Sequence, residues 1–353
     1  MRENSKKRNK SRSFILQMIW LVMILCFIGF VALTLGPAQL TSGEVAEMIA
    51  SKIPIISRYF PAVTDPLREK ILFDLRLPRI ILAALVGSAL SVTGVIFQGL
   101  FRNPMADPYV LGTSSGAALG ATVAVLSGSN LRIFGLGARP LFAFLGALLA
   151  TTLIYNMARM GRRPSLTILL LAGIAVSAFF SAFTSLLLFF RQEEMGKIIF
   201  WMMGGFSYCR WSEVRMVLPY LFIGILYACS SSRGLNLLLL GEEKAHQLGL
   251  EVEKFQKKLV FTASVLVAAA VSVSGSIGFI GLVAPHIVRI LIGPDHRHLI
   301  PVSALVGGIF LLVADTLART LISPVELPVG VLTSFVGGPF FLYLLRKSRK
   351  MFN

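Results

Sequence analysis

The chain has 353 residues, of which 55% are hydrophobic and only 14% are charged. Soluble globular proteins usually carry about 25% charged residues. Apolar runs of roughly 20 residues recur along the whole length, as in membrane proteins with several spanning helices. These features exclude an ordinary soluble globule, whose surface helices would each need a polar face.

The net charge of +17 would also suit a nucleic-acid binder. The basic residues, however, cluster at the ends of the apolar runs, which is the pattern of a membrane protein that follows the positive-inside rule. We therefore expect a lipid bilayer, and no nucleic acid, around this chain. The three cysteines are scattered, so they predict neither a disulfide framework nor a metal site.

The chain begins with the basic segment MRENSKKRNKSRSF, and an apolar run extends from Phe14 to Leu35. A signal peptide also has a basic start, but its apolar core is about 7–15 residues long and a small-residue cleavage site follows it. This run is longer and has no A-x-A site. We therefore expect residues 1–13 to be a cytoplasmic N-terminus and the run to be an uncleaved first span.

Ten helical spans are predicted, which makes the fold all-α and the protein a polytopic membrane protein. They lie near residues 14–35, 77–100, 109–127, 139–157, 166–190, 213–231, 258–275, 278–292, 301–321 and 327–346. Residues 14–346 thus form a single transmembrane domain, and residues 347–353 are a cytoplasmic tail.

The distribution of Lys and Arg places both termini on the cytoplasmic side of the cell membrane. The long loop 36–76 then lies outside, and its residues 42–52 are predicted to form a short amphipathic helix. The charged stretch 232–257 lies inside.

Within that inner stretch, residues 241–250 read GEEKAHQLGL. Glu242, Glu243 and Ala245 favour a helix, and Gly249 is suited to end it. A helix this short is marginal alone in water. We therefore expect it to dock against a partner, with an ordinary solvated loop helix as the alternative.

The residues GTSSG (112–116) match the G-x-S-x-G nucleophile elbow of hydrolases. That elbow needs a strand-to-helix turn with His and acidic partners, whereas these residues lie in an apolar helix. Gly112, Gly116 and Gly120 share one helix face, which predicts close helix packing. We therefore predict no catalytic residues and no enzyme activity, and an intramembrane hydrolase is a lower-ranked alternative.

No metal-site spacing is found among the four histidines, and no Walker motif occurs, so we expect neither a metal nor another cofactor in this chain. Acidic residues are almost absent from the spans. Asp315 is the clear exception, and Arg319 follows it at pairing distance on the same helix face. A proton- or sodium-driven secondary transporter would be expected to have more carboxylates in its spans, and it is the alternative from a different class.

The segment DLRLPR (74–79) leads into the second span from outside, with Arg76 and Arg79 on one side of the helix. Two interpretations are open. These arginines either snorkel to the membrane interface or form an exposed cationic patch for carboxylates of an outside partner.

Several stretches taken together resemble the FecCD-type permeases of ABC importers, which take up iron–siderophores, haem and cobalamin. In chain order they are RLPRIILAALVGSALSVTGVIFQGLFRNPMADPYVLGTSSGAALG (76–120), GEEKAHQLGL (241–250), GSIGFIGLVAPHIVRILIGPDHRHLIP (275–301), ADTLAR (314–319) and ELPVGVLTSFVGGPFFLYLL (326–345). The resemblance covers most of the chain after residue 70.

The resemblance implies the architecture of an ABC type II importer permease. Such permeases form homodimers or close heterodimers, with the translocation path between two ten-helix subunits. Two ABC ATPase subunits, which hold ATP and Mg, would dock on the inner helix between spans six and seven, and the matching residues are Glu242, Glu243, Ala245 and Gly249. A periplasmic or extracellular substrate-binding protein would dock outside, and the matching residues are Arg76, Arg79 and Arg319.

The function that the resemblance implies is transport of a metal chelate, most often a ferric siderophore, across the cytoplasmic membrane. Cobalamin and haem are the alternative cargoes. A chelate's metal is already ligated, so the path need not supply ligands and the sequence does not identify the cargo.

Overall fold

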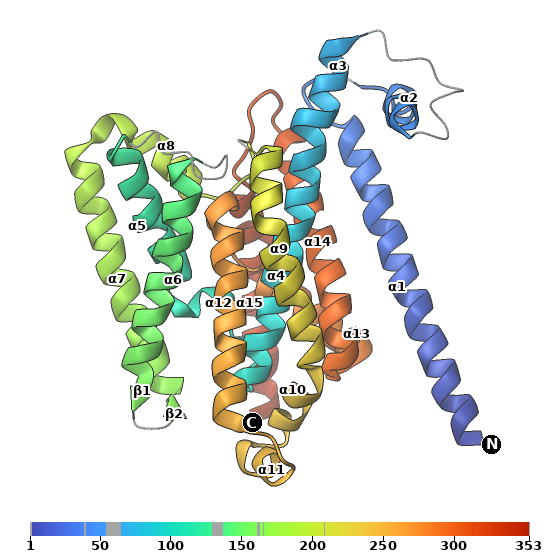
Figure 1. The fold of residues 1–353 in the computed structure, drawn as a ribbon, viewed down its shortest axis with the longest axis vertical. Coiled ribbons are helices and arrows are strands. Elements are labelled where there is room, and N and C mark those ends of the chain that lie inside the picture. The colour runs from blue at the N-terminus through green and yellow to red at the C-terminus, as the bar shows by residue number, and fades with distance from the viewer. Residues whose placement is uncertain are drawn as a thin grey trace.

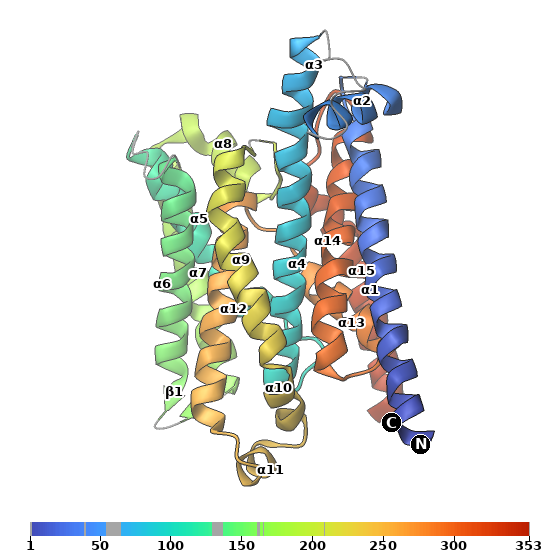
Figure 2. The same ribbon diagram turned by 45° about the vertical axis from the view of Figure 1, so that its right-hand side comes forward.

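The computed structural model describes residues 2–38, 40–53, 65–128, 137–160, 163–164, 166–207 and 209–352. Long helices run between two ends of the molecule (Figure 1). The upper end carries α2 (Ser42–Lys52), α3 (Pro66–Lys70) and α8 (Gln192–Met202). The lower end carries α10 (Ser232–Leu239), α11 (Glu242–Gln247) and both termini, as the second view also shows (Figure 2).

The remaining helices of the first half are α1 (Arg2–Thr34), a π-helix η1 (Ile71–Arg76), α4 (Leu77–Leu100), a 3-10 turn η2 (Pro108–Leu111), α5 (Thr113–Leu126), α6 (Ala138–Ala158) and α7 (Leu166–Phe190). Those of the second half are α9 (Trp211–Ser230), α12 (Val252–Ser274), α13 (Ile280–Ile292), α14 (His296–Thr320) and α15 (Val329–Phe352). A two-residue antiparallel ladder joins β1 (Arg159–Met160) to β2 (Arg163–Pro164).

The predicted all-α polytopic fold is confirmed, and each of the ten predicted spans is helical over most of its length. Within the described residues, seven helices are long and apolar enough to cross a membrane. Three shorter apolar helices account for the other predicted spans: Thr113–Leu126, Ile280–Ile292 and Val329–Leu344.

The loop predicted over residues 36–76 is more helical than expected. The amphipathic helix at residues 42–52 is confirmed as α2, which Thr41 opens with a capping box. A second helix begins at Pro66, because the Asp65 side chain accepts from the first free amides and proline suits the first helical turn. This helix runs through η1 into α4. Helix α8 was not predicted.

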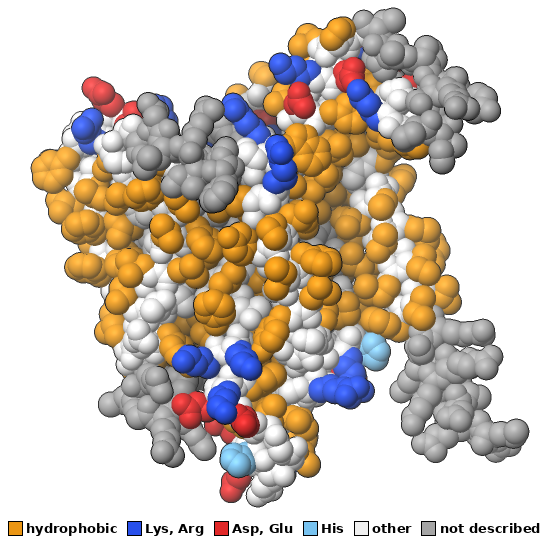
Figure 3. Space-filling model, viewed as in Figure 1, with side chains coloured by type: hydrophobic (Ala, Val, Ile, Leu, Met, Phe, Trp, Pro, Cys, Tyr) orange, Lys and Arg blue, Asp and Glu red, His pale blue; other side chains and the backbone are white. Residues whose placement is uncertain are grey.

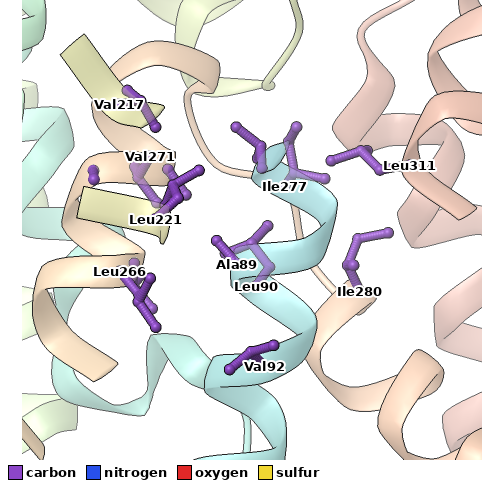
Figure 4. Packing of buried hydrophobic residues seen from close by; sticks show 14 of the residues in the cluster. Ala89, Leu90, Val92, Val217, Leu221, Leu266, Val271, Ile277, Ile280 and Leu311 are labelled. Atoms are coloured by element: carbon purple, nitrogen blue, oxygen red, sulfur yellow. The ribbon is translucent and has the colours of Figure 1, made fainter. Parts of the chain in front are cut away.

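Helix α4 is the centre of the bundle, and most of its residues are buried. Figure 4 shows Ala89, Leu90 and Val92 of α4 among side chains of α9, α12, α13 and α14. Glycines allow the closest approaches. A Cβ atom added at Gly94 would lie 1.7 Å from the carbonyl oxygen of Gly281, so no larger residue fits there without a backbone shift.

The surface of the molecule is banded. Hydrophobic side chains cover its middle, whereas Lys, Arg, Asp and Glu gather toward the upper and lower ends (Figure 3). Exposed large residues such as Phe222 and Ile223 of α9 belong to the apolar band. This is the surface expected of a protein whose surrounding medium is the lipid bilayer.

Candidate functional site

Helix α11 projects from the lower end as the outermost element there (Figure 1). It ends as predicted, because Gly249 adopts a left-handed conformation with φ +87°. The amide of Gly249 donates to the carbonyl of His246, and the amide of Leu250 donates to the carbonyl of Ala245. These two bonds form a Schellman motif, which satisfies carbonyls that the helix end would otherwise leave unpaired.

A small apolar cluster fixes α11 to the bundle. Ala245 is fully buried, and it packs with Leu238 of α10 and Val252 of α12. On the same side, the amide of Gln256 donates to a carboxylate oxygen of Glu242 at 2.9 Å. The opposite face is exposed and carries Glu243, Lys244, His246, Gln247 and Leu248. The chain thus presents a short, charged helix with one exposed leucine at its lower tip.

A polar joint connects α10 to the beginning of α14. The side-chain amide of Asn236 donates to Asp295 at 2.7 Å, and its carbonyl oxygen accepts from the backbone amide of His296 at 3.0 Å. The His296 ring nitrogen Nδ1 lies 2.8 Å from the same oxygen. Nothing in the sequence pattern indicates this joint, because Asn236 and His296 are 60 positions apart.

A buried ion cluster occupies the upper end of α14. One guanidinium nitrogen of Arg79 lies 2.9 Å from Asp315, and another lies 2.9 Å from Glu326. Arg319, one helical turn after Asp315, approaches the same carboxylate at 3.9 Å. Asp315 is completely buried. Such a charge is stable in the interior only when it is paired and hydrogen-bonded, as it is here.

Two arginines also anchor the end of α1. Arg76 donates to the carbonyl oxygens of Leu33 and Ala38, and Arg319 donates to the carbonyl oxygen of Ala32. Carbonyls near a helix end lack intrahelical partners, so guanidinium donors satisfy them well. The cluster therefore holds α1, α4 and α14 together.

The three arginines singled out from the sequence do lie together, but not in the expected state. Arg76, Arg79 and Arg319 are only 5%, 9% and 3% exposed. Arg76 and Arg79 form neither an exposed patch nor a snorkelling pair, because their guanidinium groups bond to carbonyl and carboxylate groups of this chain. Arg319 lies near Asp315, as its spacing predicted. The role of all three arginines in docking stays a prediction.

Glu326 forms the solvent-facing side of this cluster. It accepts from the hydroxyl of Ser207 at 2.7 Å and from Arg79. Partial burial raises the pKa of this carboxyl, but Arg79 and Ser207 outweigh it and hold the pKa below its usual value. No local pattern marks Glu326 as a site residue, although it opens the ELPVG stretch on which the family resemblance partly rests.

The glycines of α5 face α6. A Cβ atom at Gly116 would lie 2.3 Å from the carbonyl oxygen of Gly146, and one at Gly120 would lie 2.0 Å from that of Phe142. Gly112 precedes the helix in a left-handed conformation rather than lying within it. The GTSSG stretch thus begins a helix after a 3-10 turn, and it does not form the strand-to-helix turn that a nucleophile elbow needs.

Two cavities meet at Tyr109. One of about 570 Å³ lies between α5, α7 and α8 and is lined by hydroxyl groups of Ser114, Ser115, Ser177, Ser181, Thr184 and Ser185. The other, of about 600 Å³, includes Met202, Met203, Ser276, Ser334 and Phe335. Tyr109 lines both, and its hydroxyl is held by the carbonyl and amide of Ile277 at 3.0 and 3.1 Å. Within the described residues, no cluster of three or more His, Cys, Asp or Glu could hold a metal ion.

Residues 22–347 match the model of the FecCD transport family. The cobalamin import system permease protein BtuC of Halobacterium salinarum is 41% identical, over 92% of this chain and 94% of its own length. The hemin transport system permease protein HmuU of Yersinia pestis is 45% identical, over 78% of this chain and 83% of its own length. A solved inward-facing structure, described as of a metal-chelate type ABC transporter, shares 32% identity with a TM-score of 0.79, over 94% of this chain and 98% of that one.

These similarities agree with the fold and cover nearly the whole chain. The resemblance predicted from the sequence motifs is therefore confirmed, and a multi-pass membrane protein with a transport role follows from it. The chain belongs to the FecCD transport family, and the two relatives named above are permease proteins of a cobalamin import system and a hemin transport system.

Proposed function

We propose that this chain is the membrane subunit of an ATP-driven importer that moves a metal chelate into the cell. ATP would be hydrolysed by two separate ABC subunits, a substrate-binding protein would deliver the cargo, and a second permease subunit would complete the path. The observation that carries the proposal is α11, a charged helix that projects from the lower end and exposes Leu248.

The proposed topology places the lower end, with both termini and α11, in the cytoplasm. The basic residues favour this orientation. The chain contains no Walker motif, so the energy of ATP must reach it through a protein contact. An exposed helix that is held to the bundle through α10 and α12 is suited to be that contact, because a movement of the helix moves both neighbours.

The proposal is tested at Gly249. Gly249→Leu forces a bulky residue into a left-handed conformation at the helix end, where it projects onto the proposed docking surface. Leu248→Glu changes the same surface without backbone strain. Gly128→Leu is the matched control, because Gly128 is also left-handed, also has open space around it and lies far from α11.

The measurement is the amount of ATPase that co-purifies with each variant in detergent, together with ATPase stimulation by loaded binding protein. We expect both Gly249→Leu and Leu248→Glu to lose association or stimulation by about tenfold or more, as for truncation of a central interface residue. Gly128→Leu should retain both. Wild-type association of the two α11 variants would refute the proposed contact.

The upper end is the proposed docking site of the binding protein. Arg76, Arg79 and Arg319 gather there, and Arg79 donates to the solvent-facing Glu326. Acidic residues of a partner would compete with Glu326 for Arg79. Glu326→Gln should therefore strengthen docking and make it more sensitive to salt, since one internal negative charge is removed. Weaker docking of a folded Glu326→Gln variant would contradict this assignment.

The cargo proposed first is a ferric siderophore. The two cavities at Tyr109 offer hydroxyl, thioether and aromatic groups, which suit a chelate whose metal is already ligated. Growth of a deletion strain on single sources of ferric siderophore, haem or cobalamin is the test. Loss on siderophore supports the first proposal, loss on only one of the others assigns that cargo, and normal growth on all three would refute chelate import.

A further inference from the structure

An apolar groove of about 750 Å³ lies between α1 and the pair α13 and α14. It follows the lower half of α1, which stands apart from α13 (Figure 1). Apart from Ser13 and Gln17 of α1, its lining is hydrophobic and includes Trp20, Leu21, Ile287, Leu291, Val302 and Val306.

The groove runs along the helix axes. From Ser13 to Leu21, the α1 wall extends about 12 Å at 1.5 Å per residue. On the other wall, Val302 and Val306 are one turn apart, and His298 lies one turn below them on the same face of α14. The His298 ring packs on Phe14 with ring centroids 4.5 Å apart. The groove is therefore apolar along its length and polar at its lower edge.

The groove opens toward the membrane. Of α1, Leu16 and Trp20 in the groove wall are 59% and 63% exposed, and α13 and α14 are both apolar helices. Hydrocarbon chains are thus the medium that meets this surface. Lipid-facing helices usually pack against one another, whereas here an apolar hollow extends along about two turns of α1 on the side that faces α13.

The lower edge of the groove carries several basic residues and the carboxylate of Asp295, which lies 3.9 Å from the His298 ring. Arg297 is exposed beside His298 at the start of α14. The twelve residues that precede Ser13 in the sequence include six Lys and Arg and one Glu. Basic residues between or beside spanning helices attract the headgroups of anionic lipids. In Figure 3, basic and histidine side chains lie where the hollow beside α1 meets the lower end.

We propose that this groove binds an acyl chain of an anionic phospholipid, whose phosphate lies at the lower edge near Ser13 and Arg297. The apolar wall accounts for the chain, and the basic edge accounts for the charge of the headgroup. The bound lipid fills the space between α1 and α14, and so it supports the position of α1. This proposal depends on membrane insertion of the fold and not on the cargo or the ATPase contact.

Trp20 provides a direct reporter, because it lines the groove. The full chain with Trp201→Phe and Trp211→Phe retains Trp20 as its tryptophan. It is reconstituted in phosphatidylcholine vesicles that contain increasing fractions of phosphatidylglycerol, with bromine on the acyl chains of one lipid or the other. We expect brominated phosphatidylglycerol to quench Trp20 at low mole fraction, with saturation. Each basic residue at the edge should favour the anionic lipid by about fivefold.

Two variants and two controls locate the binding site of the lipid. Val306→Phe fills the groove and should reduce the quenching of Trp20 by brominated phosphatidylglycerol to that by brominated phosphatidylcholine. Leu317→Phe, at an exposed position elsewhere on the same helix, is the matched control and should leave it unchanged. Arg297→Gln should lower the preference for the anionic lipid while quenching at saturation persists. A Phe222→Trp reporter on exposed α9, in a chain without the other tryptophans, should show no preference.

Two results would overturn the proposal. Quenching proportional to mole fraction, equal for both lipids and unchanged by Val306→Phe, would mean that Trp20 meets bulk lipid only. Protection of Trp20 from both brominated lipids would mean that protein, such as a second copy of the chain, covers the groove. If the tryptophan replacements disturb folding, native mass spectrometry of otherwise unaltered chains gives the same comparison. Phosphatidylglycerol should remain bound to the wild type and to Leu317→Phe but not to Val306→Phe.

Discussion

The two ends of α14 are held in different ways. At the upper end, Asp315 is completely buried between the guanidinium groups of Arg79 and Arg319. At the lower end, Asp295 and His296 are joined to α10 through the neutral amide of Asn236. One helix thus begins in a hydrogen-bonded joint whose one carboxylate is half exposed, and it ends in a buried ion cluster.

The two ends of α14 therefore differ in the free energy needed to separate each of them from the neighbouring helices. Removing one partner of a buried ion pair leaves an uncompensated charge, which typically costs about 3–5 kcal/mol. Opening the lower joint costs about 0.5–1.5 kcal/mol per bond, because the Asp295 carboxylate is 46% exposed and water can replace Asn236 as its donor. We therefore infer that the upper end is the fixed end of α14 and that the lower end, beside α10, is the one that can move.

The largest expected change in the free energy of unfolding is that caused by replacing Asp315. Asp315→Ala leaves Arg79 and Arg319 buried without their shared carboxylate, and we expect a loss of about 3–5 kcal/mol in the free energy of unfolding. Denaturant unfolding in detergent micelles measures it. Asp74→Ala removes an exposed carboxylate from the same end and should change stability by less than about 0.5 kcal/mol. Equal effects of the two variants would mean that the ion cluster is not the stronger anchor.

A smaller loss of stability is expected from replacing Asn236. Asn236→Ala deprives Asp295 and the His296 amide of their partner, and we expect a loss of about 1–3 kcal/mol. The loss should be local, so amide hydrogen exchange should accelerate in the first turns of α14 while the turns around Asp315 stay protected. Arg233→Ala is the control, because Arg233 is exposed and lies in α10, the helix that contains Asn236. Faster exchange along the whole of α14 would contradict a separable lower joint.

The smallest effect is the pH dependence that Glu326 gives to the upper cluster. Because its pKa lies below the usual value of 4.5 in the folded chain, this carboxylate stabilises the fold above about pH 4.5. That contribution is lost as the pH falls through the lower, folded-state pKa. The stability difference between the wild type and Glu326→Gln should therefore shrink as the pH is lowered below 4.5. A difference that grew on acidification would show that protonated Glu326 is the stabilising form.

The sequence by itself determined the all-α membrane fold, the positions of ten apolar helices, α2, and the end of α11 at Gly249. These features are local: a span needs only a run of apolar residues, and a helix end needs only a few capping residues. The same local reasoning missed α8, which is short, and the helix that begins at Pro66 within a predicted loop.

Only the tertiary structure decided the state of the arginines and the existence of the Asn236 joint. Arg79 and Asp315 are 236 positions apart in the chain, and no local pattern shows that they meet. The local sequence around an arginine at the end of a span does not differ between an arginine that faces solvent and one that faces a buried carboxylate. Which of these it does depends on how α4 packs against α14, where small residues such as Gly87 and Gly307 bring the two backbones into contact.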